Sequence, residues 1–81
     1  MRARVLVRLK REVLDPQGEA VRRALVALGI DGIRDARVGK IIELEVDMAP
    51  ELAQQQIERA AKSLLANPVI EDFEITLEND S

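Results

Sequence analysis

Hydrophobic and polar residues alternate along the first segment of the chain. Its two faces carry Ala3, Val5, Val7 and Leu9 on one side and Arg4, Arg8 and Lys10 on the other. A two-residue period predicts a strand over residues 3–11 with one buried face. Leu6 interrupts the polar face, and we interpret it either as a harmlessly exposed side chain or as a contact with a partner. Leu6 is therefore a candidate oligomer contact.

Two later segments change to the helical period, and each begins at a proline. Asp15 can cap a helix and Pro16 has a helical φ preset, while Gly29 is suited to end it. Pro50 opens the second helix, and residues 67–68, Asn-Pro, end it. The expected inner stripes are Val21, Leu25 and Leu28 in the first helix and Ala53, Ile57, Ala60, Ala61 and Leu64 in the second.

Alternation returns over residues 33–47, and its parity survives the interruption at Gly39 and Lys40. The stretch is either one long bent strand or two strands joined by a turn, and we favour the long or bulged strand, which serves topologically as two. A last strand is expected from about residue 70 to residue 77. Residues 79–81 are expected to form a loose tail.

The order strand, helix, strand therefore occurs twice. This β-α-β-β-α-β order predicts an α+β, ferredoxin-like two-layer sandwich, with two helices on one face of an antiparallel sheet and a long bent middle strand. The part of residues 33–47 after Lys40 serves as the third strand and carries Glu43 and Glu45, and the last strand carries Asp72 and Glu74. Because opposite charges favour neighbouring strands, the basic first strand is expected between these two. The alternative is that these charges only form a solvated face.

Length and composition indicate one domain spanning residues 1–81, with 47% hydrophobic and 33% charged residues. The net charge of -3, and Phe73 as the only aromatic residue, argue against nucleic-acid binding. No apolar run approaches the length of a membrane span, so we expect a cytoplasmic protein. A domain of this size has a thin margin of stability, which favours a homo-oligomer.

The side chains that usually carry catalysis are scarce. The chain has no cysteine, histidine, tyrosine or tryptophan, and Ser63, Thr76 and Ser81 have no imidazole to activate them. Carboxylate pairs such as Glu43 with Glu45 indicate solubility rather than acid–base chemistry when no cleft encloses them. We therefore expect no catalytic residue and no metal site in this chain.

One short motif leaves a different function open. Arg37, Gly39 and Lys40 could bind a phosphate, because glycine allows close backbone approach and the bases neutralise charge. The spacing lacks the features of a P-loop, so the motif is weak and we favour a bend with two solvated bases. The alternative function is a ligand-sensing regulatory domain of ferredoxin-like fold.

Three strings then point to a known family: Leu-Asp-Pro-Gln-Gly at 14–18, Arg-Val-Gly-Lys at 37–40, and Leu-Leu-Ala-Asn-Pro-Val-Ile-Glu-Asp-Phe at 64–73. In this order and spacing the chain resembles, over nearly its whole length, the PurS family. Members of this family are the small subunits of multi-chain phosphoribosylformylglycinamidine synthase in purine biosynthesis.

The resemblance implies a non-catalytic part in an ATP- and glutamine-dependent C–N ligase. A glutaminase subunit would release ammonia, and a large synthetase subunit, with its own ATP and Mg, would make the amidine. The small subunit would associate with itself, as a dimer or tetramer, and bridge the two others so that ammonia passes between them. It would hold no cofactor of its own.

Carried onto this chain, the resemblance gives a set of partner-contact candidates: Asp15, Pro16, Gln17, Gly18, Arg37, Gly39, Lys40, Asn67 and Pro68. Local structure already explains four of these residues without a partner. Asp15 caps the first helix, Gly39 allows a bend, and Asn67 and Pro68 end the second helix. Arg37 and Lys40 are the better candidates, because their charges have no obvious local task and a charge at an interface rim affects assembly.

Overall fold

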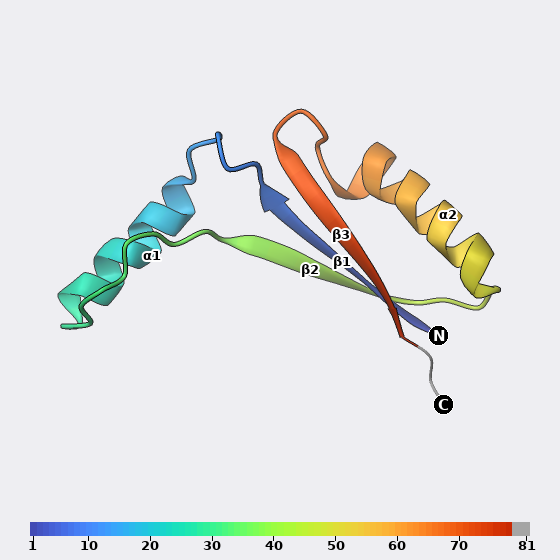
Figure 1. Ribbon diagram of the computed structural model, residues 1–81, viewed down its shortest axis with the longest axis horizontal. Coiled ribbons are helices and arrows are strands. Elements are labelled where there is room, and N and C mark those ends of the chain that lie inside the picture. The colour runs from blue at the N-terminus through green and yellow to red at the C-terminus, as the bar shows by residue number, and fades with distance from the viewer. Residues whose placement is uncertain (79–81) are drawn as a thin grey trace.

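The computed structural model describes residues 1–78, which form three strands and three helical segments (Figure 1). In chain order these are β1 (Arg2–Leu9), α1 (Pro16–Ala27), β2 (Gly39–Glu45), α2 (Pro50–Ala60), η1 (Ala61–Leu65) and β3 (Glu71–Glu78). The segment η1 continues α2 as a π-helix, in which the Ala66 N–H donates to the Ala61 carbonyl at 2.9 Å. The expected tail, residues 79–81, lies outside the described residues.

The strands form one antiparallel sheet in the order β2-β1-β3, which places the basic strand in the middle as predicted. Arg4 lies opposite Glu43 on β2, and Arg8 lies opposite Asp72 on β3. Ion pairs on this surface include Arg2–Glu45, Arg4–Glu78, Arg8–Glu74 and Lys10–Asp72. Exposed pairs contribute only about 0.2–1 kcal/mol each, so they favour this strand order more than they stabilise the fold.

The opposite face of the sheet carries the core, beneath α2. The buried apolar residues are Ala3, Val5, Val7, Ala53, Ile57, Ala61 and Ala66, with Phe73, Ile75 and Leu77 of β3 packed against them. The alternation predicted for β1 and the inner positions Ala53, Ile57 and Ala61 of the second helix are thus confirmed. Because Val5 and Val7 are the largest fully buried side chains among the described residues, this core is thin.

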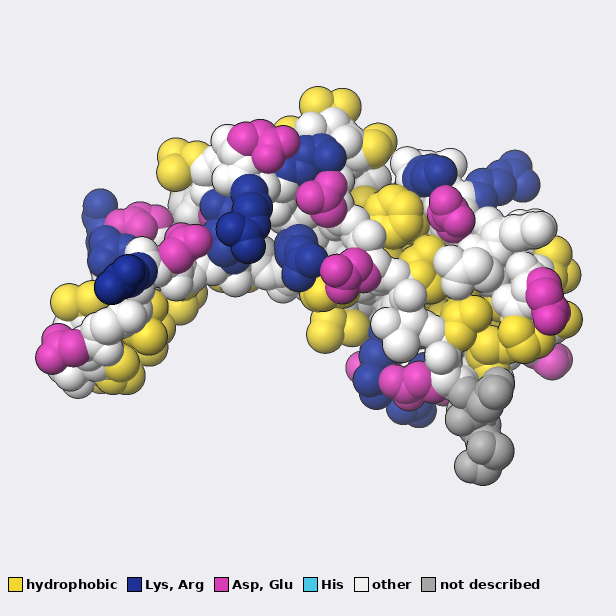
Figure 2. Space-filling view, viewed as in Figure 1, with side chains coloured by type: hydrophobic (Ala, Val, Ile, Leu, Met, Phe, Trp, Pro, Cys, Tyr) yellow, Lys and Arg dark blue, Asp and Glu magenta, His cyan; other side chains and the backbone are white. Residues whose placement is uncertain are grey.

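The first helix does not lie on the sheet. Together with the extended residues 30–38 that return beside it, α1 forms an arm (residues 16–38) that projects from one end of the sheet (Figure 1). The α+β class, the antiparallel sheet and the two long helices are confirmed, but within this chain only α2 covers the sheet. Val21 and Leu28, expected on the inner stripe, are 43% and 76% exposed. Figure 2 shows hydrophobic side chains along the lower edge of the arm.

The long middle strand is also shorter than expected. The backbone is extended before Gly39, but pairing with β1 begins only at that residue. The register places Gly39 opposite Arg8, and β1 ends one residue later at Leu9. Residues 30–38 therefore extend past the end of the sheet, where none of the described strands lies beside them.

The resulting molecule is flat and elongated, with extents of 48 × 32 × 14 Å. Its radius of gyration is 16.0 Å, whereas a compact domain of this length has about 12 Å. Within residues 1–78 no helix combines the length and the apolar character needed to cross a bilayer.

Candidate partner-binding edge

Antiparallel pairing gathers the predicted site segments at one end of the sheet. The end of β1 lies beside the starts of both neighbours, because Arg8 pairs with Gly39 and Leu9 pairs with Glu71. The Lys10 N–H donates to the Ile70 carbonyl at 2.8 Å and so joins the two loops beyond the strands. We call this end the loop edge; it comprises residues 10–18, 36–40 and 66–71.

Asp15 connects the start of α1 to the start of β2. One carboxylate oxygen accepts from the Gly18 N–H at 2.9 Å, which caps the helix, and the other accepts from the Val38 N–H at 2.8 Å. The side chain is buried. These backbone N–H groups, Gly18 first, favour the charged form and hold the pKa of Asp15 below its ordinary value.

Arg37 has a local task, contrary to the argument from the sequence that its charge had none. Its guanidinium donates to the carbonyls of Lys10 and Val13 at 2.8 and 2.9 Å. A positively charged donor makes stronger hydrogen bonds than a neutral one. Arg37 therefore fastens the loop after β1 to the returning segment of the arm.

Two glycines allow this edge to pack closely. A Cβ on Gly18 would lie against the carbonyl of Ala36 in the returning segment, and a Cβ on Gly39 would lie 2.8 Å from the Val7 carbonyl oxygen. Pro16 occupies the first turn of α1, and Gln17 next to it is exposed. Capping and close approach thus account for Asp15, Pro16, Gly18 and Gly39 within the chain, while partner contact at these positions stays a prediction.

The turn at Asn67 and Pro68, which follows the end of the second helix, is also held by local hydrogen bonds. The Asn67 side chain accepts from the Val69 N–H at 3.1 Å, and the Asn67 N–H donates to the Glu71 carboxylate at 2.7 Å. The Asn67 carbonyl accepts from the N–H groups of Ile70 and Glu71 at 3.1 and 2.7 Å. The turn between η1 and β3 therefore has a fixed shape.

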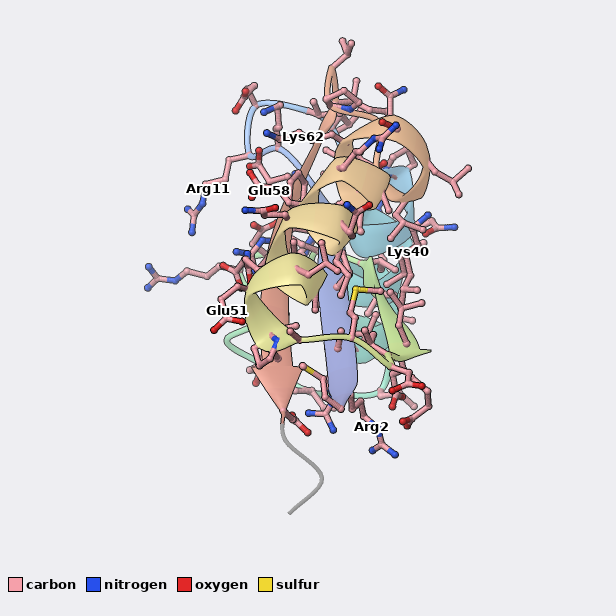
Figure 3. All side chains as sticks on the ribbon, turned by 90° about the vertical axis from the view of Figure 1, so that its right-hand side faces the viewer. Arg2, Arg11, Lys40, Glu51, Glu58 and Lys62 are labelled. Carbon is pink, nitrogen blue, oxygen red and sulfur yellow. The ribbon has the colours of Figure 1, made fainter. Side chains whose placement is uncertain are left out.

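The three residues of the possible phosphate motif do not converge. Arg37 lines a hollow of about 500 Å³ with Arg8, Arg11, Asp35 and Asp72, whereas Gly39 and Lys40 line a smaller one of about 260 Å³ with Asp15 and Gln17. In Figure 3, Arg11 and Lys40 reach away from the molecule on opposite sides. Arg37 and Lys40 thus line two different hollows, which adjoin at Arg8 and Leu9.

On the open face of the sheet, Leu6 meets a second apolar residue. Leu6 is half-buried and lies opposite Ile41 of β2, which is 61% exposed. Arg4 and Arg8, which form ion pairs with Glu78 and Glu74 of β3, precede and follow Leu6 on this face of β1. An apolar centre with a polar rim is typical of contact surfaces, so Leu6 stays a candidate oligomer contact.

Sequence reasoning missed the most exposed large apolar residues in the loop edge and in η1, which leads into it. Leu14, Leu64 and Val69 are 80%, 81% and 79% exposed. Leu64 had been expected on the inner stripe of the second helix, and that expectation is wrong, because the π-helical turn η1 shifts the helical period at this point. No group of acidic, cysteine or histidine residues suited to a metal ion occurs among the described residues.

The uncovered arm and the apolar loop tips define a class: a small α+β subunit that presents surfaces to other protein chains. The family described as PurS, phosphoribosylformylglycinamidine (FGAM) synthase, matches residues 2–79. The chain belongs to the PurS family.

Relatives of known identity and structure agree over nearly full length. The phosphoribosylformylglycinamidine synthase subunit PurS of Mycobacterium leprae is 50% identical over 78 residues, which are 96% of each chain. The crystal structure of Methanocaldococcus jannaschii PurS superposes with a TM-score of 0.90 at 36% identity, covering 99% of this chain and 98% of that one. A chain in the structure of PurLQS from Thermotoga maritima gives 0.84 at 34% identity, with 93% of each chain covered.

Proposed function

We propose that this chain is the assembly subunit of FGAM synthase in purine biosynthesis and works in the cytoplasm. It holds a glutaminase subunit and an ATP-dependent synthetase subunit together, so that ammonia moves between their sites without release to water. The observation that carries this proposal is the full-length likeness to a chain of PurLQS. ATP and Mg act on the synthetase subunit.

The residue inventory supports a role without catalysis. The chain lacks histidine and cysteine, and the clearest polar cluster at the loop edge, around Asp15 and Arg37, is committed to backbone hydrogen bonds. Such a chain contributes contact surfaces to the complex, while bond making belongs to its partners. The ligand-sensing alternative has less support, because the Arg37 guanidinium already donates to two backbone carbonyls and lines a different hollow from Lys40.

Self-association is part of the same proposal, and the second copy is the natural cover for the arm. The chain exposes 6115 Å², roughly 1,300 Å² more than expected for a compact monomer of 9.0 kDa. A standard interface buries about 800 Å² on each partner, so the excess is sufficient for a stable dimer.

The geometry suggests a reciprocal exchange of arms. β2 is an edge strand, and residues 33–38 continue its line past the sheet. A two-fold axis near Gly39 would place residues 33–38 of each copy along the free edge of β2 in the other. Each α1 would then cover the half-exposed inner residues of the partner's β2. Because the contact is two-fold symmetric, both copies would use the same surface.

The proposed function is tested by reconstitution with the glutaminase and synthetase subunits. We expect glutamine-dependent amidation to need this chain, whereas amidation with added ammonium salt proceeds without it, because only the first route requires ammonia transfer. Co-elution of all three chains in size-exclusion chromatography is the structural readout. Equal glutamine-dependent rates with and without the chain would refute the proposal.

A further inference from the structure

The free end of the arm is a turn in which an aspartate directly precedes a glycine. Residues 28–32 join α1 to the returning segment at the end of the arm away from the sheet (Figure 1). Asp31 is the only aspartate or asparagine in the sequence that a glycine follows. Such a pair is chemically reactive, because the glycine nitrogen can attack the aspartyl side-chain carbonyl without hindrance from a Cβ.

The structure leaves both reacting groups free. Asp31 and Gly32 are exposed and lie in neither a helix nor a strand. Within residues 1–78 the Asp31 carboxylate has no hydrogen bond or ion pair, and the Gly32 N–H has no acceptor. Gly32 has a φ of 89°, and a Cβ at this position would meet no atom within 4 Å. The turn therefore has room for the change in backbone shape that ring closure requires.

The other described aspartates are less suited to this reaction. Asp15 is buried and precedes a proline, which has no N–H to react. Asp72 lies in β3 and is paired with Lys10. Asp35 and Asp47 are exposed but precede alanine and methionine, whose side chains hinder the attacking nitrogen. The reactivity is therefore concentrated at the tip of the arm.

We propose that Asp31 isomerises spontaneously to isoaspartate in the folded protein, which makes the tip of the arm a repair site for an isoaspartyl carboxyl methyltransferase. The Gly32 nitrogen first bonds to the side-chain carbonyl carbon of Asp31, and one water leaves to give a succinimide ring. Water then adds to the main-chain carbonyl of the ring, and its C–N bond breaks. The backbone now runs through the former side chain, so it is longer by one methylene group and carries a free α-carboxylate.

This α-carboxylate is the group that the repair enzyme would recognise. The methyltransferase would move a methyl group from S-adenosylmethionine to the carboxylate and release S-adenosylhomocysteine. Loss of methanol from the methyl ester would re-form the succinimide, and its hydrolysis at the side-chain carbonyl would restore aspartate.

Contacts on both sides of the turn allow the modified chain to stay folded. The Ile30 N–H donates to the Leu25 carbonyl at 3.1 Å, which fixes the chain to the end of α1. On the returning side, the Val38 N–H donates to the Asp15 carboxylate at 2.8 Å. The additional methylene group can bulge into solvent between these two anchors. We therefore expect isoaspartate to accumulate without unfolding.

The test ages the purified full-length chain at physiological pH and temperature and follows its tryptic peptide 24–34, in which Asp31 is the only aspartate. Liquid chromatography with electron-transfer fragmentation should show an isoaspartyl peptide of unchanged mass that grows with time, together with a form that is lighter by one water. Methyl transfer from S-adenosylmethionine by a purified isoaspartyl methyltransferase should rise in parallel. Circular dichroism melts of the aged chain should stay close to those of the fresh chain.

Two glycine variants form a matched pair. Gly32→Ala places a Cβ beside the attacking nitrogen and should slow isoaspartate formation several-fold. Gly29 has a φ of 86° and equally open surroundings, so Gly29→Ala imposes similar backbone strain and should age like the wild type. Asp31→Glu should abolish the modification, because its side chain would have to close a larger ring.

Three results would overturn the proposal. A full-length chain that stays unmodified while a synthetic peptide of residues 24–34 isomerises would show that the folded or assembled protein protects the tip. Equal rates for the wild type and Gly32→Ala would contradict attack by the Gly32 nitrogen. Isoaspartate that forms at Asp35 or Asp47 instead of Asp31 would show that the assigned site is wrong.

Discussion

At the scale of single residues, the Asp15 carboxylate links segments of the loop edge that are distant in the sequence. It caps α1 and also receives the Val38 N–H, so one buried carboxylate sets the position of the arm relative to β2. Its charge is stabilised by backbone dipoles, with the Arg37 charge as a lesser contribution. This arrangement makes stability depend on pH in a defined direction.

Replacement of Asp15 by asparagine should lower the thermal midpoint at pH 7 by about 4–8 °C, the shift for loss of one N-cap in a domain of this size. The amide NH₂ would face one of the two N–H donors that the carboxylate now accepts. The lowered pKa of Asp15 means that its contribution is complete above its ordinary pKa near 3.8 and is lost as pH falls through the lower folded-state value.

Melts between pH 2 and pH 7 measure this effect as the difference between wild type and variant. The difference should shrink as pH falls below about 4. Glu19, whose pKa the Arg22 guanidinium lowers to about 2, titrates in the same region but is common to both proteins. A gap between the two curves that stays constant with pH would contradict the role assigned to the Asp15 charge.

At the scale of elements, the arm depends on the close approach of α1 to its returning segment. Gly18 is buried on the side of the helix that faces Ala36, and a methyl group there would meet the backbone rather than a movable side chain. The helix and the segment are therefore locked together before any partner arrives.

We expect Gly18→Ala to destabilise the folded chain by about 1–3 kcal/mol, although alanine is the better helix former. Urea unfolding followed by circular dichroism measures the change. The neighbouring exposed position supplies the control, because Gln17→Ala meets no backbone and should stay close to wild type. Stabilisation by Gly18→Ala would show that helix and segment are not in contact in solution.

At the scale of the whole molecule, one chain does not enclose its own core. The fully buried side chains are small, and α1 exposes apolar residues that a compact α/β sandwich would cover. Stability should therefore be shared with a second copy, and this makes it a function of chain concentration.

A tenfold rise in chain concentration should stabilise the wild-type dimer by about 1.4 kcal/mol, which raises the thermal midpoint measurably. Leu28→Asp should abolish this dependence and give a monomer in sedimentation velocity, because it places a charge on the covered face of the arm. Val69→Asp, at a similarly exposed position outside that face, should behave as wild type. A wild-type chain that is monomeric at all concentrations would refute the exchange of arms.

Much of the architecture followed from pattern. The two-residue period of β1, the proline at each helix start and the opposite charges of neighbouring strands were enough to predict an antiparallel sheet with the basic strand in the middle. These features depend on neighbouring residues in the sequence or on pairs of adjacent strands, so they can be predicted from the sequence directly. The partner-contact candidates also fall at one end of the sheet, because antiparallel pairing brings their segments together.

Other features depend on where distant segments lie. The sequence could not show what α1 packs against, because an apolar stripe indicates that a helix face will be buried but not which chain buries it. Nor could it reveal the task of Arg37, whose acceptors are backbone carbonyls 24 and 27 residues away, or the exposure of Leu64, which a π-helical turn decides. Residue order therefore determined the elements and their charges, while the tertiary structure decided which apolar surfaces remain open, because burial is a property of the assembled whole.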